Sequence, residues 1–161
     1  MRNRSFILAA VLAVLMVAWA TPAHALAPFV QFQDSKDAGL GYGFGLKHTF
    51  LGIVPIVGFD LRASWLHYSD EDKLPSSFET FPLEVAATAK LGIFYGGLGV
   101  GYYINSGDFK PDDEVGGFAA AGAGFKLLGL GAFAELRYLL LEPGNGDMSG
   151  VGANVGVTLP L

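Results

Sequence analysis

The chain has no cysteine among its 161 residues. Disulfide bonds, thiol nucleophiles and thiolate metal sites are therefore excluded. Charged residues are also scarce, at 16% of the chain against 52% hydrophobic residues. Yet no apolar run after residue 25 reaches the roughly 20 residues that a membrane-spanning helix needs. Because lipid forces every backbone polar group to pair within the protein, the closed β-barrel is the remaining way for such a chain to span a membrane.

The first 25 residues have the pattern of a cleaved secretory signal peptide. Arg2 and Arg4 precede an apolar run, and the tripeptide Ala23-His24-Ala25 fits the small-residue cleavage pattern. The alternative is a single membrane anchor, for which the run is short and no stop-transfer pattern follows. We therefore predict a signal-peptide helix at residues 1–25, followed by one domain at residues 26–161.

Hydrophobic and polar residues alternate along the rest of the chain in segments of about ten residues. One face of each segment is apolar, and the other holds glycine, small polar residues and charges. The segments predict eight strands, at residues 29–33, 39–48, 56–67, 78–91, 94–105, 116–127, 131–141 and 150–159. Short Leu-Gly turns alternate with longer acidic loops, as do the periplasmic turns and extracellular loops of outer-membrane barrels. We therefore predict an all-β fold, an eight-stranded antiparallel up-and-down transmembrane β-barrel with a polar lumen.

The charges on the inward face are predicted to form a network inside the lumen. Its members are Asp60, Arg62, Glu84, Glu135, Arg137, Lys47, Lys90 and Lys126. The first five lie at similar heights, and leaving any of them unpaired inside the lumen would cost several kcal/mol. We expect these five to form ion pairs and to plug the lumen, and a narrow conducting channel is the alternative. The three lysines precede the short turns, where they either set a mild anion preference or extend their amines into water.

A segment that occurs in two of the predicted strands supports a closed barrel. Residues 59–63 (Phe-Asp-Leu-Arg-Ala) resemble residues 134–138 (Ala-Glu-Leu-Arg-Tyr), and each segment follows a Leu-Gly turn. In an eight-stranded barrel, the third and seventh strands face each other across the lumen.

Three segments resemble the outer-membrane β-barrel domain superfamily, which includes the small OmpA-, OmpX- and opacity-protein-like barrels. They are residues 95–102 (YGGLGVGY), 135–138 (ELRY) and 155–159 (VGVTL). The resemblance implies a protein in the outer membrane of a Gram-negative-type bacterium, in contact with outer-membrane lipid and lipopolysaccharide. It also implies insertion by the barrel assembly machinery, which usually reads a terminal aromatic residue, whereas this sequence ends in Leu161.

The candidate catalytic set is Ser69, His67 and Glu79. Residues 67 and 69 share the outward face where a predicted strand ends, and Glu79 begins the next strand on that face. A serine with a histidine base and a carboxylate is an acyl-transfer arrangement. The set is similar to that of the lipid A deacylases, also small barrels, which implies Ser69 as nucleophile, His67 as base and Glu79 as its orienting group. The alternative is an aromatic girdle at the membrane interface, formed by Trp65, His67, Tyr68, Phe78, Tyr102 and Tyr138.

Acidic loop residues are candidates for binding Ca²⁺ or Mg²⁺, which prefer carboxylate oxygens. They are Asp70, Asp72, Asp112 and Asp113, and no loop has EF-hand spacing. We expect no metal and no cofactor, and the net charge of −5 argues against nucleic acid as a partner. We predict a monomeric, non-catalytic outer-membrane protein with a plugged lumen, whose acidic loops are available to a surface ligand. A lipid A acyl hydrolase and a narrow channel are the alternatives.

Overall fold

The computed structural model describes residues 25–51, 56–69, 77–107, 111–127, 130–142 and 147–159. Residues 1–24 of the predicted signal peptide lie outside this part of the chain. The described residues form eight strands: β1 (Ala25–Ser35), β2 (Gly39–Leu51), β3 (Val57–Tyr68), β4 (Phe78–Leu91), β5 (Phe94–Ser106), β6 (Glu114–Leu127), β7 (Leu130–Leu140) and β8 (Gly150–Thr158). Among these residues there is no helix long and apolar enough to cross a membrane.

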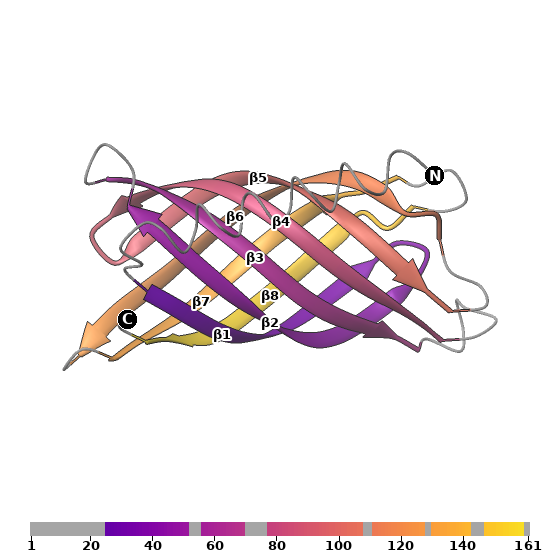
Figure 1. Ribbon diagram of the computed structural model, residues 1–161, viewed down its shortest axis with the longest axis horizontal. Coiled ribbons are helices and arrows are strands. Elements are labelled where there is room, and N and C mark those ends of the chain that lie inside the picture. Colours follow the sequence, from indigo (N-terminus) through magenta and orange to yellow (C-terminus); the bar gives the residue numbers. More distant parts are fainter. Residues whose placement is uncertain are drawn as a thin grey trace, which may run out of the picture.

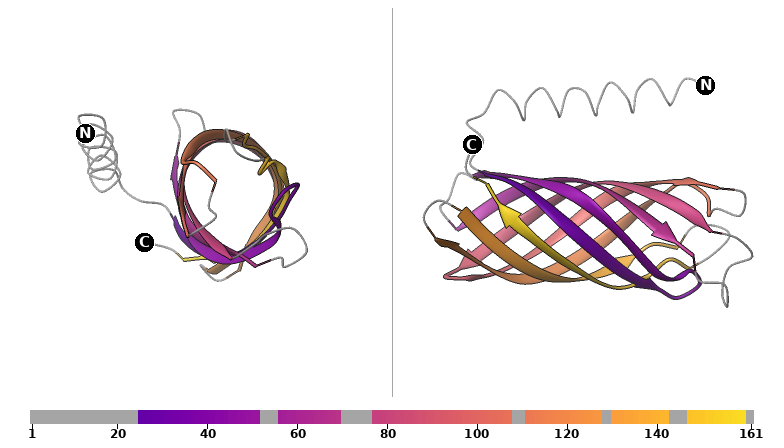
Figure 2. Two further views of the ribbon diagram at one scale, coloured as in Figure 1. Left: turned by 90° about the vertical axis from the view of Figure 1, so that its right-hand side faces the viewer. Right: turned by 90° about the horizontal axis from the view of Figure 1, so that it is seen from below.

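Each strand pairs antiparallel with the next, and β1 also pairs with β8, so the sheet closes on itself. Figure 1 shows the strands crossing the long axis obliquely, and the end-on view in Figure 2 shows them as a complete ring. The predicted all-β fold, an eight-stranded antiparallel up-and-down barrel, is confirmed. The β2–β3, β4–β5 and β6–β7 connections lie at one end of the barrel, and the other four lie at the opposite end, which we call the loop end.

The first strand is longer than predicted and closes the barrel. The sequence pattern predicted only residues 29–33, whereas β1 pairs with β2 along Ala25–Ser35 and with β8 along Phe29–Ser35. Pairing on two sides supplies backbone hydrogen bonds even where the alternation of side chains is weak. A sheet closed in this way has no free edge at which another chain can add a strand.

The pleat of the strands sorts apolar side chains to the outside and charged ones to the inside. Leu98 and Phe44 on the outer face are 70% and 61% exposed, whereas Arg62 and Glu84 in the lumen are each 2% exposed. Water-soluble proteins show the reverse, because charged side chains are seldom fully buried in them. An apolar exterior around a polar interior is the distribution expected of a barrel that faces lipid.

Pro82 interrupts the hydrogen-bond ladder between β3 and β4. The register of the two strands runs on both sides of Ser64 and Trp65 but includes neither of these described residues. The backbone N–H of Lys90 donates to Ile56 O at 2.8 Å, so alternate residues of β4, residue 82 included, point their backbone groups toward β3. Proline has no N–H to donate, so the ladder loses one bond opposite Ser64.

Candidate functional site: the closed lumen and the outer rim

The lumen holds two ion-pair clusters, each built around one arginine. In the first, Arg62 of β3 reaches across to Glu135 of β7, with 2.6 Å between Nη1 and Oε1 and 3.1 Å between Nη2 and Oε2. The same guanidinium donates from Nη2 to Asp60 Oδ2 at 3.0 Å. Asn154 Nδ2 donates to Glu135 Oε1 at 3.0 Å, and Thr49 Oγ1 donates to Asp60 Oδ1 at 2.8 Å. One buried cation is therefore shared by two carboxylates, whose other lone pairs accept from neutral donors.

The second cluster joins β7 to β4 and β5. Arg137 donates from Nη1 to Glu84 Oε2 at 3.1 Å and from Nη2 to Glu84 Oε1. The Tyr103 hydroxyl donates to Glu84 Oε1 at 2.7 Å and accepts from Arg137 Nη2 at 3.2 Å. A two-pronged arginine–carboxylate pair is among the strongest hydrogen-bonded arrangements in proteins. Glycine makes room for it, because a Cβ at Gly101 would lie 2.8 Å from Glu84 Cγ.

The ring of Phe118 on β6 contacts both arginines. Its centroid lies 4.5 Å from Arg137 Cζ and 5.3 Å from Arg62 Cζ, within the range of cation–π attraction. The structure thus brings the five mid-lumen charges of the sequence prediction into one connected group. Sequence reasoning missed Phe118, although the alternation of β6 puts residue 118 on the inward face.

The three predicted lumen lysines have two different environments. Lys47 is buried, with its Nζ 4.0 Å from Glu135 Oε2 and 3.9 Å from the centre of the Phe133 ring. It therefore belongs to the first cluster. Lys90 and Lys126 are exposed near the end opposite the loop end, and the described residues provide no ion pair for either.

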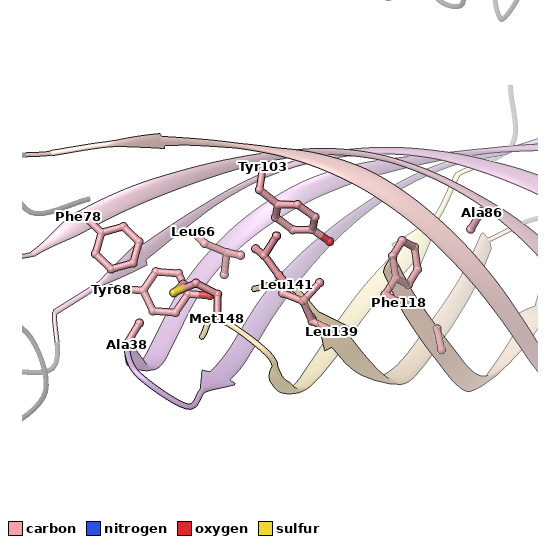
Figure 3. Packing of buried hydrophobic residues seen from close by; sticks show 11 residues of the cluster. Ala38, Leu66, Tyr68, Phe78, Ala86, Tyr103, Phe118, Leu139, Leu141 and Met148 are labelled. Atoms are coloured by element: carbon pink, nitrogen blue, oxygen red, sulfur yellow. The ribbon is translucent and has the colours of Figure 1, made fainter. Parts of the chain in front are cut away.

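An apolar cap, which sequence reasoning did not predict, fills the lumen near the loop end. The rings of Tyr68 and Phe78 stack at its centre, 4.9 Å between centroids with 12° between planes. Figure 3 shows the cap packed together, and it comprises Ala38, Leu66, Tyr68, Phe78, Tyr103, Leu139, Leu141 and Met148. These residues are all buried. The lumen is therefore filled by apolar side chains near the loop end and by ion pairs below them.

The prediction that Tyr68 and Phe78 belong to an outer aromatic girdle is wrong. Both are inside the barrel, at 1% and 2% exposure, because even-numbered residues of β3 and β4 face the lumen. An aromatic residue at the end of a strand can lie either at the membrane interface or in the lumen. Only its position in the alternation of the strand distinguishes the two places. The other girdle candidates, Trp65, Tyr102 and Tyr138, lie on the outer face.

A hydrogen-bonded knot beside the cap ties the β1–β2 connection to the segment before β8. Lys36 Nζ donates to Asp147 Oδ2 at 2.6 Å, and Asp147 N donates to Asp37 Oδ2 at 2.7 Å. Ser149 N donates to Asp147 Oδ1 at 2.9 Å. Hydrogen bonds from Lys36 and then Ser149 lower the pKa of Asp147 to about 2, and the same contact with Asp147 raises the pKa of Lys36. The seam between β1 and β8 is therefore fastened beyond the ends of its strands.

The candidate catalytic residues come together only in part. His67 and Glu79 face each other in the register of β3 and β4, and Ser69 is exposed two residues beyond His67. No hydrogen bond joins any two of these three described residues. The imidazole instead contacts the rings of Tyr42 and Trp65, at centroid distances of 5.6 and 6.0 Å. The imidazole is therefore part of a group of rings on the outer face.

The candidate metal ligands do not form a site in the described part of the chain. Asp70 and Asp72 lie outside it. Asn105 N donates to Asp113 Oδ1 at 2.8 Å, and Asn105 Nδ2 donates to Asp112 O at 3.0 Å, so both acidic residues fasten the end of β5. Among the described residues, no three His, Cys, Asp or Glu side chains are grouped in a way that could hold a metal ion.

Comparison with known proteins supports the fold. No protein-family model matches the chain, and no curated protein sequence matches it. Among solved structures, the chain is similar to the crystal structure of Neisserial surface protein A, with a TM-score of 0.58 and 14% sequence identity. The match covers 88% of this chain and 98% of that chain. Nearly the whole of Neisserial surface protein A therefore shares its fold with this barrel.

Proposed function

We propose that this protein is a non-catalytic integral barrel of the outer membrane, with a lumen closed to ions and acidic loops at the cell surface. The observation that carries the proposal is the reversed distribution of side chains, with large apolar residues outside and ion pairs inside. The fold likeness to a protein named as a surface protein supports this location. Outer-membrane lipid, lipopolysaccharide and the barrel assembly machinery are then its partners.

Three successive layers support a closed lumen. An ion entering from the loop end meets the stacked rings of Tyr68 and Phe78, which offer it no ligands. Below them, the carboxylates of Glu84 and Glu135 are already bound by arginine. Nearest the other end, Lys47 lies over the ring of Phe133. An eight-stranded barrel is just wide enough for such side chains to fill it.

The loop end is the surface that the proposal assigns to an external ligand. Acidic residues lie in the connections at this end, among them Asp37, Asp112, Asp113 and Glu142. Loops carried on a rigid scaffold are where binding specificity usually resides. The closed sheet leaves no strand edge for self-association, and we propose that the protein is a monomer.

Cell fractionation and planar-bilayer recording test this proposal together. We expect the protein in the outer-membrane fraction of a Gram-negative host, and we expect no stable conductance steps from purified protein. A difference in gel migration between boiled and unboiled samples provides the check that the barrel is folded. Recovery in the inner membrane would contradict the location, and regular conductance steps from folded protein would contradict the closed lumen.

Acyl hydrolysis of lipid A is a second candidate, favoured by the register that places Glu79 opposite His67. In this reaction the Ser69 hydroxyl would attack an ester carbonyl while His67 accepted its proton, and the ester C–O bond would break as His67 returned the proton to the departing alcohol. Water would then release the acyl chain from Ser69 as a free acid. Mass spectra of lipid A from cells with and without the protein distinguish the two candidates. The non-catalytic proposal predicts identical spectra. Loss of the mass of one acyl chain, abolished by Ser69→Ala, would instead establish the hydrolase.

A further inference from the structure

Four rings form a continuous ledge on the outer wall of β2 and β3. Tyr42 contacts His67 at 5.6 Å, His67 stacks on Trp65 at 6.0 Å, and Trp65 contacts Phe44 at 5.4 Å. We call Tyr42, Phe44, Trp65 and His67 the ring ledge. Tyr42 and Phe44 are 49% and 61% exposed, so the ledge is accessible from outside the barrel.

Polar groups border the ring ledge on the neighbouring strands. Glu79 of β4 faces His67 in the register, and Ser106 of β5 faces Glu79 in turn. Ser69 is exposed just beyond the end of β3. A carboxylate, an imidazole and two hydroxyls therefore line the side of the ledge nearest the loop end.

This arrangement is more specific than an aromatic girdle. Tyr102 and Tyr138 also lie on the outer face, yet neither makes a ring contact among the described residues. The aromatic residues of a girdle need no contacts with one another, because each ring is stabilised at the headgroup level independently. Rings that touch one another in series, beside a carboxylate, form a platform of fixed shape.

A separate groove lies deeper on the outer wall. It has a volume of about 470 Å³ and is lined mainly by apolar side chains of β3, β4 and β5, including Leu61, Val85 and Val100. Leu61 is six residues from His67 along β3, which corresponds to roughly 20 Å at about 3.3 Å per residue. The groove and the ring ledge share no lining residue, and β3 contributes to both.

We propose that the ring ledge and Glu79 bind the sugar headgroup of a glycolipid in the outer leaflet, with an acyl chain directed toward the groove. The placement in the outer leaflet rests on the proposed function. The apolar face of a sugar ring packs on the aromatic rings, and its hydroxyls donate to the Glu79 carboxylate and hydrogen-bond with His67. The headgroup of an anionic phospholipid has no sugar ring to pack on the aromatic rings, so a headgroup that contains a sugar suits the site better.

Trp65 provides the readout. The chain has two tryptophans, Trp19 and Trp65, so a full-length Trp19→Phe protein reports from the ledge alone. We would refold this protein in a phosphocholine detergent, which has no sugar, and titrate it with lipid A, with phosphatidylglycerol and with free N-acetylglucosamine. We expect lipid A to change the Trp65 fluorescence with saturation at a low mole fraction, and the other two compounds to bind at least tenfold more weakly. Equal saturation by phosphatidylglycerol would overturn the proposal in favour of a general girdle, and equal binding of the free sugar would overturn the role of the acyl chain.

Substitutions in the same background locate the site. Loss of one hydrogen bond typically weakens binding about five- to tenfold, which is the effect we expect of Glu79→Met and of His67→Phe. Tyr138→Phe, on the outer face away from the ledge, is the matched control and should leave the titration unchanged. Unaltered lipid A affinity in both ledge variants, with heat-modifiable migration showing that they are folded, would overturn the proposal. Fractionation and conductance do not depend on this site, so its failure is distinguishable from failure of the proposed function.

Discussion

Arg137 and Glu84 meet across the lumen although 53 residues separate them in the chain. The pair is isolated from solvent, with both side chains 1% exposed, and the Tyr103 hydroxyl also donates to Glu84. Removing one partner of such a buried pair strongly destabilises the folded protein, because the remaining charge is then unpaired and has lost its contact with water.

Arg137→Met should therefore lower the free energy of unfolding by about 3–5 kcal/mol, since it leaves Glu84 charged and without its cation. The double variant Glu84→Gln/Arg137→Met should recover much of this loss, because neither charge remains and the amide still accepts from Tyr103. Urea unfolding in lipid vesicles, monitored by heat-modifiable gel migration, measures the free energy of unfolding of Arg137→Met, of Glu84→Gln and of the double variant. A double variant as unstable as the sum of the two single variants would contradict a direct ionic coupling.

The knot between Lys36 and Asp147 should depend on pH in a defined direction. The pKa of Asp147 is lowered from 3.8 to about 2. The stabilisation of the folded state by the Asp147 carboxylate is therefore complete above pH 3.8 and disappears as the pH falls through about 2. The pKa of Lys36 is raised above 10.5, so on the alkaline side the contribution disappears only as the pH rises past that value. An NMR titration of the Asp147 carboxyl should give a midpoint near 2. In Lys36→Met the midpoint should rise, and an unchanged midpoint would show that Lys36 is not the main cause.

The apolar cap should contribute more to stability than any ring on the outer face. Tyr68 is 1% exposed and stacks on Phe78, so Tyr68→Ala leaves a cavity and should cost about 3–5 kcal/mol. Tyr138→Ala removes the same atoms from the outer wall and is the control, with a much smaller expected loss. Thermal unfolding of the two variants in the same vesicles compares them. Similar losses would mean that the cap is not tightly packed.

Replacing Pro82 should restore the ladder between β3 and β4. Pro82→Val has a similar volume and adds an N–H opposite Ser64 O, a hydrogen bond worth about 0.5–1.5 kcal/mol. The greater freedom of the unfolded chain offsets part of this gain. Amide exchange at Ser64 and Leu66, whose N–H groups point toward β4, should become slower in the variant. Faster exchange would indicate that the ring of Pro82 is needed where it is, in the packed lumen wall.

Much of the fold could be predicted from the sequence because a lipid-facing barrel repeats one simple pattern. Alternation with period two marks each strand and also assigns each residue to a face, so Arg62 and Glu84 could be placed in the lumen without coordinates. The predicted limits of β4 agree with those in the structure. In contrast, β1 extends beyond the predicted range because hydrogen bonds to β2 and β8 hold its backbone where the alternation of side chains is weak.

Pairing across the lumen could not be predicted in the same way. Arg62 faces Glu84 in the register of β3 and β4, yet its guanidinium bonds to Glu135. That choice depends on the stagger of the closed barrel and on the direction of long side chains, which no local pattern encodes. The cap was missed for a related reason. Tyr68 and Tyr42 are both tyrosines near the loop end of a strand, and they differ only in whether the alternation of the strand turns them inward or outward.

The crossing of the arginines separates the charge balance of the lumen from the pairing of the strands. Glu84 lies opposite Arg62 in the register of β3 and β4, yet Arg137 of β7 binds Glu84. Arg62 in turn binds Asp60 on its own strand and Glu135 of β7. Neutrality inside the lumen is therefore a property of the closed ring of strands and not of any one hairpin.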